Sequence, residues 1–154
     1  MKLAILAPDR IYFEGEAEEL VLPTNTGQIG ILPNHTQLLT GLSVGVLQVR
    51  RTPDSSGNST STVSPQSWAN MALMGGFALI QKNTITLLVN EAEWGVSINR
   101  EEARKVYKET KEQYTQLEKT PKAKQKIEAK LLLQRAQARY QAVEDQEGAP
   151  HEVG

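Results

Sequence analysis

The chain contains no cysteine, which excludes disulfide bonds, thiolate nucleophiles and cysteine-ligated zinc sites. Aromatic residues make up only 5% of its 154 residues, so a core must be mainly aliphatic. No apolar run reaches the roughly 18 to 20 residues that a membrane-spanning helix needs. A net charge of -1 gives no overall attraction to nucleic acid or anionic lipid.

Residues suited to catalysis are also scarce. His35 is one of two histidines, and no G-x-S-x-G nucleophile elbow accompanies it, so we expect a turn histidine rather than a hydrolase centre. Gly27 and Gly30 lack the lysine and serine/threonine that end a phosphate-binding loop, and we expect them to shape a turn. The sequence therefore predicts no catalytic residue, no metal and no cofactor.

The first part of the chain is rich in glycine and proline and contains short, often alternating apolar segments. Such segments with turn residues between them are typical of an antiparallel sandwich or barrel. Gly75-Gly76 lies between two of them, and we interpret the pair as a tight hairpin turn that requires positive φ. The predicted strands span residues 3–7, 18–22, 28–32, 44–49, 69–74, 77–80 and 84–89.

Two helices are predicted after this region, because no glycine occurs from residue 96 to 147. Asn99 can cap the first helix, and Thr120-Pro121 can start the second. We expect an antiparallel hairpin, with 144–154 as a flexible tail. The buried stripe predicted for the first helix is Ala103, Val106, Tyr107, Thr110, Tyr114 and Leu117. The stripe predicted for the second is Ile127, Leu131, Ala138 and Ala142.

The segment 52–67 is composed mainly of serine, threonine, glycine and proline, and we expect a disordered, dispensable loop between two strands. The hairpin is expected to be weakly anchored, because its stripes contain few large apolar side chains and bury little area.

Charge is distributed unevenly between the two parts. Residues 119–140 carry seven basic residues against Glu128 alone, a net charge of +6, whereas residues 1–98 carry -3. Lysines 122, 124 and 126 lie in the first turns of the second helix, where the helix dipole disfavours them. This pattern fits either a solvated face or a face for an acidic partner. A nucleic-acid-binding module is the alternative function, although few aromatics accompany the basic residues.

Two stretches carry a resemblance to a known family. LVLPTNTGQIGILPNHTQLLTGL (20–42) and ALMGGFALIQKNTITLLVNEAE (72–93) resemble the epsilon subunit of F-type ATP synthases, most closely its plastid and cyanobacterial branch. The resemblance covers about residues 1–143. It implies an all-β sandwich of about ten strands in two sheets over 1–98, followed by a C-terminal antiparallel α-helical hairpin over 99–143.

The resemblance also implies a function. Epsilon is a non-catalytic central-stalk subunit that binds the gamma subunit and touches the ring of c subunits, coupling proton flow to ATP synthesis. Its helices can extend toward the catalytic head, meet an acidic segment of the beta subunit and inhibit ATP hydrolysis. The expected location is peripheral, on the stromal side of the chloroplast thylakoid membrane or the cytoplasmic side of a cyanobacterial one.

The matching positions supply the candidate residues. The c-ring contacts implied by the resemblance are Thr26, Gly27, Gln28 and Ile29, with Gln28 where some bacterial relatives have glutamate. The implied gamma contacts are Pro33, Asn34, His35 and Met74. The implied inhibitory basic face is Lys122, Lys126, Lys130, Arg135 and Arg139.

One departure concerns nucleotide binding. Some bacterial relatives bind ATP through an Ile/Leu-Asp-x-x-Arg-Ala motif, which aligns with residues 98–103. Here Asn99 replaces the aspartate and Glu102 replaces the arginine. Because a glutamate repels phosphate, we expect no tight ATP binding, which calorimetric titration can check.

Overall fold

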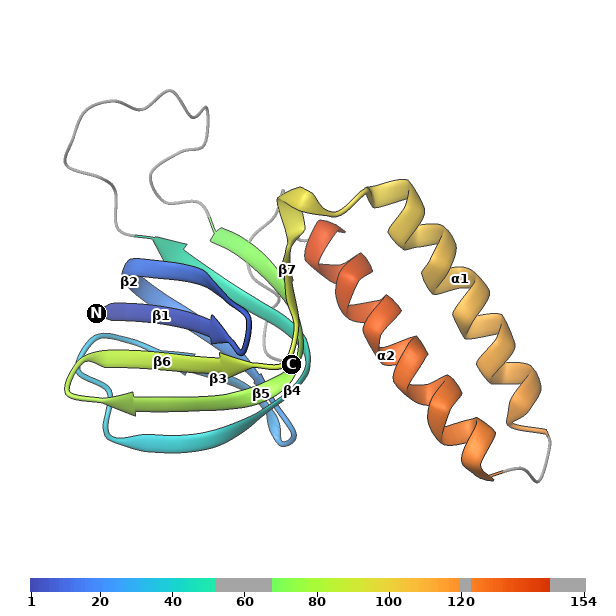
Figure 1. Ribbon diagram of the computed structural model, residues 1–154, viewed down its shortest axis with the longest axis horizontal. Coiled ribbons are helices and arrows are strands. Elements are labelled where there is room, and N and C mark those ends of the chain that lie inside the picture. Colours follow the sequence, from blue (N-terminus) through green and yellow to red (C-terminus); the bar gives the residue numbers. More distant parts are fainter. Residues whose placement is uncertain (52–67, 120–122, 145–154) are drawn as a thin grey trace.

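The computed structural model describes residues 1–51, 68–119 and 123–144, which form a β-sandwich with a helical hairpin beside it (Figure 1). This confirms the predicted fold class. The predicted loop at 52–67, the start at Thr120-Pro121 and the tail from 145 lie outside the described residues. The strands are β1 (Lys2–Ala7), β2 (Arg10–Thr24), β3 (Gly27–Ile31), β4 (Leu38–Arg51), β5 (Trp68–Gln81), β6 (Thr84–Val89) and β7 (Ala92–Trp94). The α-helices are α1 (Arg100–Leu117) and α2 (Ala123–Glu144).

The strands join in one sheet that closes on itself. Their order is β1-β6-β5-β4-β2-β3, with β7 beside β5 and a further pairing between β1 and β2. The β1–β6 pair is parallel and the other pairs are antiparallel. Closure leaves few free strand edges, which suits a small all-β unit.

The described residues form seven strands rather than about ten, because three strands are long. β2 has 15 residues, and β4 and β5 have 14 each. β2 pairs with β1 through its first half and with β3 and β4 through its second half. One long strand thus contributes to both layers of the sandwich.

The Gly75-Gly76 pair is not a hairpin turn, and that prediction is wrong. β5 continues through it, although both glycines have the expected positive φ, 87° and 147°. A Cβ at Gly76 would lie 2.1 Å from the backbone oxygen of Leu88 on the neighbouring strand. Glycine is required here because the chain bends within a paired strand, where a side chain has no room.

This bend changes which side chains of β5 face inward. Before it, Met71 and Leu73 are in the core, whereas after it Ala78 and Ile80 are. The odd-numbered residues face inward first, and the even-numbered ones follow. A shift of this kind is the expected effect of a bulge in a strand of period two.

The core is aliphatic, as the composition predicts. Its large side chains come from every long strand and are fully buried. These are Leu3, Ile5, Leu20, Leu22, Ile31, Leu47, Met71, Leu73, Ile80, Ile85 and Leu87.

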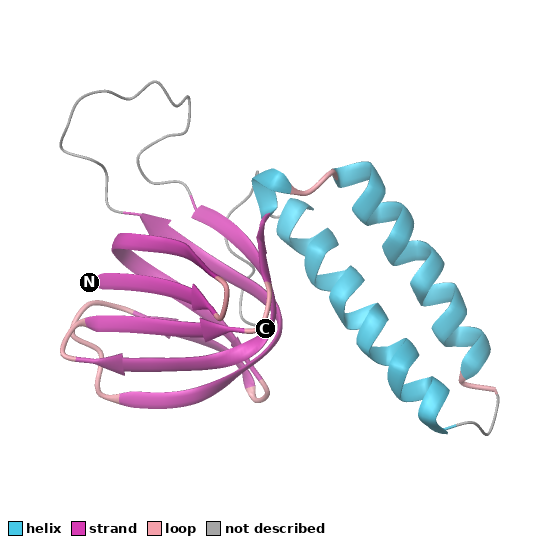
Figure 2. Cartoon of the chain, in the orientation of Figure 1, coloured by secondary structure: helices cyan, strands magenta, loops and turns pink. Residues whose placement is uncertain are grey.

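The first helix follows its prediction closely. The Asn99 side chain accepts a hydrogen bond from the Glu102 backbone N–H at 3.1 Å, so the expected N-cap is confirmed. The six residues of the predicted stripe are the ones in α1 that are buried or half-buried. α1 lies antiparallel to α2, as Figure 2 shows.

The stripe predicted for α2 is half wrong. Ala138 and Ala142 are buried, but the side chains of Ile127 and Leu131 face solvent and are 62% and 56% exposed. Ala129 and Ala136 are also buried, but they lie roughly 120° to 140° around the helix from Ala142, so α2 has a second buried side. Alanine allows the backbones to approach closely, so this helix packs through its smallest apolar side chains.

The hairpin rests on the outer side of β4 and β5. Ala138 and Ala142 of α2 form a small cluster with Val46, Ala72, Ile98 and Ala103, and Val44, Met74, Tyr140 and Val143 pack against it. At about 25 cal/mol per Å², such side chains contribute little when buried, so apolar contact holds the hairpin only moderately.

Candidate functional site

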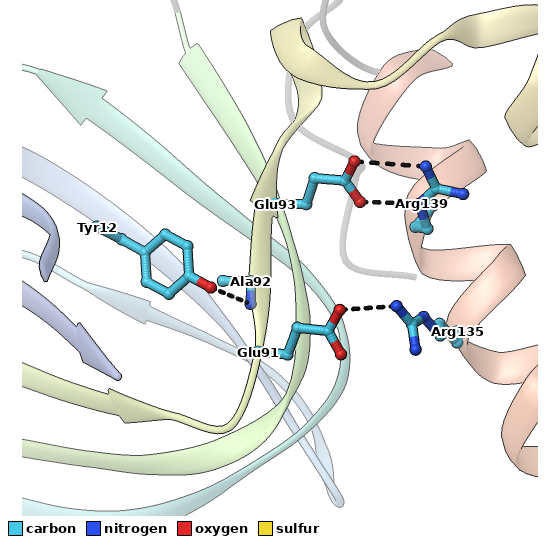
Figure 3. Close-up of polar contacts among 6 residues, drawn as sticks. All are labelled: Tyr12, Glu91, Ala92, Glu93, Arg135 and Arg139. Carbon is cyan, nitrogen blue, oxygen red and sulfur yellow. Dashed lines mark hydrogen bonds and ion pairs between the residues drawn. The ribbon is translucent and has the colours of Figure 1, made fainter. Parts of the chain in front are cut away.

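Ion pairs span the junction between the sandwich and α2 (Figure 3). Arg139 donates from Nε to Glu93 Oε2 at 2.8 Å and from Nη2 to Oε1 at 3.3 Å. One turn earlier, Arg135 donates from Nη2 to Glu91 Oε1 at 2.7 Å. The two arginines are four residues apart on one helix face, and the two glutamates alternate along an extended segment, so their spacings of roughly 6 Å match.

The backbone fixes the segment that carries the two glutamates. The Ala92 N–H between them donates to the Tyr12 hydroxyl at 3.3 Å, and the Met74 N–H donates to the Glu91 carbonyl at 2.9 Å. Ala92–Trp94 also pair with β5. Both glutamates therefore extend from a backbone segment that the sandwich itself holds in place.

The two pairs differ in their exposure to water. The Arg139 side chain is 18% exposed, whereas Arg135 and Glu91 are each about half exposed. The hydrogen bond with Glu93 raises the pKa of the Arg139 guanidinium, and burial opposes this with a smaller effect. Nearby Glu102 and Glu91 add to the rise. Arg139 thus remains charged, and its pair with Glu93 is the stronger of the two.

A third ion pair closes the open end of the hairpin. Arg100 donates from Nε and Nη2 to the two carboxylate oxygens of Glu144, at 2.9 and 3.1 Å. This pair joins the start of α1 to the end of α2. It lies within the hairpin, so it does not depend on docking to the sandwich.

The junction borders an open cavity of about 480 Å³. Three arginines, two glutamates and Tyr12 line it, so its chemistry is ion pairing rather than bond making. Glu102 contributes negative charge close to Arg139. The lining residues are Arg10, Tyr12, Glu91, Ala92, Glu93, Arg135 and Arg139.

The predicted c-ring residues lie together at the β2–β3 turn. Thr26 and Gly27 are exposed, while Gln28 and Ile29 are half-buried in β3. Gly27 has φ 120°, and its carbonyl accepts a hydrogen bond from the Thr24 hydroxyl, so the glycine shapes the turn as expected.

The predicted gamma residues do not form one surface. Pro33, Asn34 and His35 follow β3, at its opposite end from the β2–β3 turn, and the Asn34 N–H donates to the Asn83 side chain at 2.9 Å. Met74 instead packs against the hairpin cluster. It belongs to the junction while the hairpin is docked.

The predicted basic face is also divided. The step from Lys130 to Arg135 is five residues, which turns about 140° around a helix of 3.6 residues per turn. Arg135 and Arg139 therefore face the sandwich, and Lys126 and Lys130 lie toward the other side of α2. Lys122 lies outside the described residues.

An apolar row on the outside of the sheet was not predicted. Phe77 pairs with Leu88, Leu88 with Leu6, and Leu6 with Ile11, so their side chains are neighbours across four strands. Phe77 is 61% exposed, and Ile11 and Leu88 are similarly exposed. Leu39, on β4, is 70% exposed near the same row. A row of exposed apolar side chains is a candidate interaction surface.

The sequence did contain a signal for this row. Leu87, Leu88 and Val89 are consecutive apolar residues, whereas a strand with one wet face alternates. A continuous run predicts that both faces of the strand contact something. The run in β6 therefore predicts an apolar contact on the outer face of the strand as well as the core on its inner face.

Other kinds of site find no support in the described part of the chain. No group of three or more histidine, cysteine, aspartate or glutamate side chains there could hold a metal ion. Within the same residues, no helix is long and apolar enough to cross a membrane.

Comparison with known proteins agrees with this architecture. A sequence profile described as "ATP synthase, Delta/Epsilon chain, beta-sandwich domain" matches residues 1–95. The chloroplast ATP synthase epsilon chain of Staurastrum punctulatum is 49% identical over 143 residues, which cover 93% of this chain and 92% of that protein. The ATP synthase epsilon chain of Synechococcus sp. (strain CC9311) is 42% identical over 142 residues, covering 92% and 96%.

A solved structure supports the fold. A chain in the cryo-EM structure of the Euglena gracilis mitochondrial ATP synthase (OSCP/F1/c-ring, rotational state 1) matches with a TM-score of 0.71 at 19% identity. The match covers 92% of this chain and 79% of that chain. At this identity the likeness concerns the fold.

Proposed function

This chain belongs to the ATP synthase delta/epsilon family, and we propose on that basis that it is the non-catalytic epsilon subunit of an F-type ATP synthase central stalk. In this role residues 1–98 bind the gamma subunit and the c ring, and residues 99–143 regulate ATP hydrolysis. The chloroplast and cyanobacterial relatives support a complex at the thylakoid membrane, with this subunit peripheral on its stromal or cytoplasmic side.

The apolar row is the observation that carries this proposal. A stalk subunit without catalytic groups must act by holding its neighbours, and that requires a surface to bury. Phe77 and Leu88 are adjacent in the row and provide exposed apolar area that a partner can bury. We assign the row to the gamma subunit.

The assignment is tested with Phe77→Ser combined with Leu88→Ser. Gamma binding should weaken at least about tenfold, because two exposed anchors lose their apolar burial. The matched control is Ile127→Ser with Leu131→Ser, which removes equally exposed apolar groups from α2. Circular dichroism checks that both variants fold. Unchanged gamma affinity in the sandwich variant would refute the assignment.

The β2–β3 turn is the proposed c-ring contact. Thr26 and Gly27 form its exposed tip, and Gln28 offers neutral hydrogen-bonding groups rather than a carboxylate. Contact with the polar loops of the ring then depends little on salt, since no charge of this chain is neutralised there.

The hairpin is the proposed inhibitory element. Its docking rests on small apolar contacts and ion pairs, which suits a segment that leaves its resting place. Replacing Lys122, Lys126, Lys130, Arg135 and Arg139 by Ala should raise the ATPase activity of the head while leaving gamma binding intact. A nucleic-acid-binding role gains no support, because Arg135 and Arg139 already have carboxylate partners.

A further inference from the structure

We propose that Glu91 and Glu93 form a glutamate latch that competes with the acidic partner segment of the hairpin for Arg135 and Arg139. While it is docked, the hairpin hides Arg135 and Arg139, which are two of the four described residues of its proposed basic face. Docking and full partner binding are mutually exclusive. This inference rests on the proposed inhibitory function for its partner, but the latch itself can be tested in the isolated chain.

The first support is that the latch resembles the ligand it excludes. Two carboxylates stand at a spacing that fits two arginines on successive helix turns, and the distances are 2.7 and 2.8 Å. The Tyr12 and Met74 hydrogen bonds hold the segment in place. A preorganised pair of carboxylates loses little entropy on binding, so it competes well against a flexible acidic segment.

The second support is that the rest of the junction is weak. The buried side chains that α2 contributes to the cluster at the junction are Ala138 and Ala142, with Tyr140 and Val143 half-buried against it. The ion pairs therefore form a large share of the docking free energy. The Arg139 side chain is the most buried of the four, and its loss should matter most.

The third support is the division of the basic residues around α2. Lys126 and Lys130 lie away from the latch, and Lys130 is exposed while the hairpin is docked. An acidic segment can contact this side first, without any opening. Arg135 and Arg139 become available only after the latch opens, so capture proceeds in two steps.

The test uses the full chain with Glu93→Gln, Glu91→Gln and the double substitution. These keep the shape of each side chain and remove its charge. Amide hydrogen exchange within α2 should accelerate about tenfold for Glu93→Gln, about twofold for Glu91→Gln, and more for the double variant. Glu109→Gln with Glu112→Gln is the matched control, because both residues are exposed on α1 and form no ion pair with any described residue. Exchange in the control should stay unchanged.

Exchanging the two charges tests whether Glu93 and Arg139 act on docking as an ion pair. Glu93→Arg and Arg139→Glu should each loosen α2, and the two together should restore most of its protection. The latch is overturned if α2 of the charge-exchanged double variant exchanges as fast as that of the single variants. It is also overturned if the double glutamine variant exchanges at the wild-type rate.

Activity then separates the latch from the proposed function. In the assembled ATPase, the double glutamine variant should inhibit hydrolysis several-fold more strongly, because its arginines are free. If exchange accelerates and charge exchange rescues it, the latch holds. If inhibition then stays unchanged, the mutual exclusion and the proposed inhibitory role of the hairpin fail while the contact itself stands.

Discussion

At the scale of single residues, Gly76 is a position where we expect the fold to tolerate substitution poorly. It lies inside a paired strand at φ 147°, with the Leu88 oxygen 2.1 Å from where a Cβ would stand. Gly76→Ala should therefore lower the free energy of unfolding by about 2 to 4 kcal/mol, since neither the backbone nor its neighbour can yield cheaply.

Urea denaturation measures this effect. Gly30→Ala is the control, because nothing lies within 4 Å of a Cβ added there and its φ is not in the left-handed region. It should change stability by less than about 1 kcal/mol. Equal losses in both variants would contradict the role of the bend.

Gln48 and Asn70 form an unusual buried pair at the residue scale. They face one another across β4 and β5, are almost completely buried, and their side-chain amides make no hydrogen bond in the described structure. Replacing both, as Gln48→Met with Asn70→Leu, should be neutral or stabilise by about 1 kcal/mol, because two unpaired polar groups leave the interior. Thermal unfolding checks this, and a large loss would show that the amides have a partner.

The raised pKa of Arg139 leads to a prediction about pH. Its pKa is raised in the folded chain, so its contribution to stability is complete below the ordinary arginine pKa and is lost only as pH rises through the higher folded value. Both values lie above the range in which proteins are studied. Raising the pH from about 7 to about 9 should leave hydrogen exchange in α2 unchanged after correction for its intrinsic rate. Accelerated exchange in that range would point to another titrating group.

Among the elements, the two helices show how much of helix packing a sequence pattern predicts. α1 is amphipathic at a period of 3.6 residues, and all six predicted stripe residues are withdrawn from solvent. α2 buries alanines and exposes Ile127 and Leu131, although these two lie on the same side of the helix as Ala138 and Ala142. The periodicity therefore predicts the side of the helix but not which of its turns are covered. The ion pairs of the junction join residues 44 and 46 positions apart, which no local pattern reveals.

This packing makes a prediction for α2. Ala142 is fully buried against the sandwich, so Ala142→Leu should overfill the junction and weaken docking by about 1 to 3 kcal/mol. Leu131→Ala should change docking by less than about 0.5 kcal/mol, because its side chain faces solvent. Hydrogen exchange within α2 reports both. The reverse order would favour the stripe predicted from the sequence.

At the scale of the whole molecule, two parts of different character meet. The sandwich is held by a closed sheet and an aliphatic core, which burial patterns predict well. Its closure and its long strands are less predictable, because β2 and β5 change partners at places where alternation breaks. The family resemblance supplied the candidate contacts, but their division among separate surfaces required the fold.

Salt should therefore act on the two parts differently. Ion pairs at the junction are partly exposed and are screened, whereas apolar burial is not weakened by salt. Raising sodium chloride from about 0.05 M to about 1 M should accelerate exchange in α2 a few-fold and leave β4 and β5 unchanged. Equal protection of α2 at both concentrations would argue against an electrostatic contribution to docking.

The bend at Gly75-Gly76 has a consequence for communication between the two surfaces. Because the inward side of β5 changes there, the strand turns Ala72 outward beneath α2 on one side of the bend and Phe77 outward into the apolar row on the other. One uninterrupted strand is thus shared by two docking platforms. A force applied at either surface is therefore transmitted to the other along the backbone of a single strand, with no loop between them.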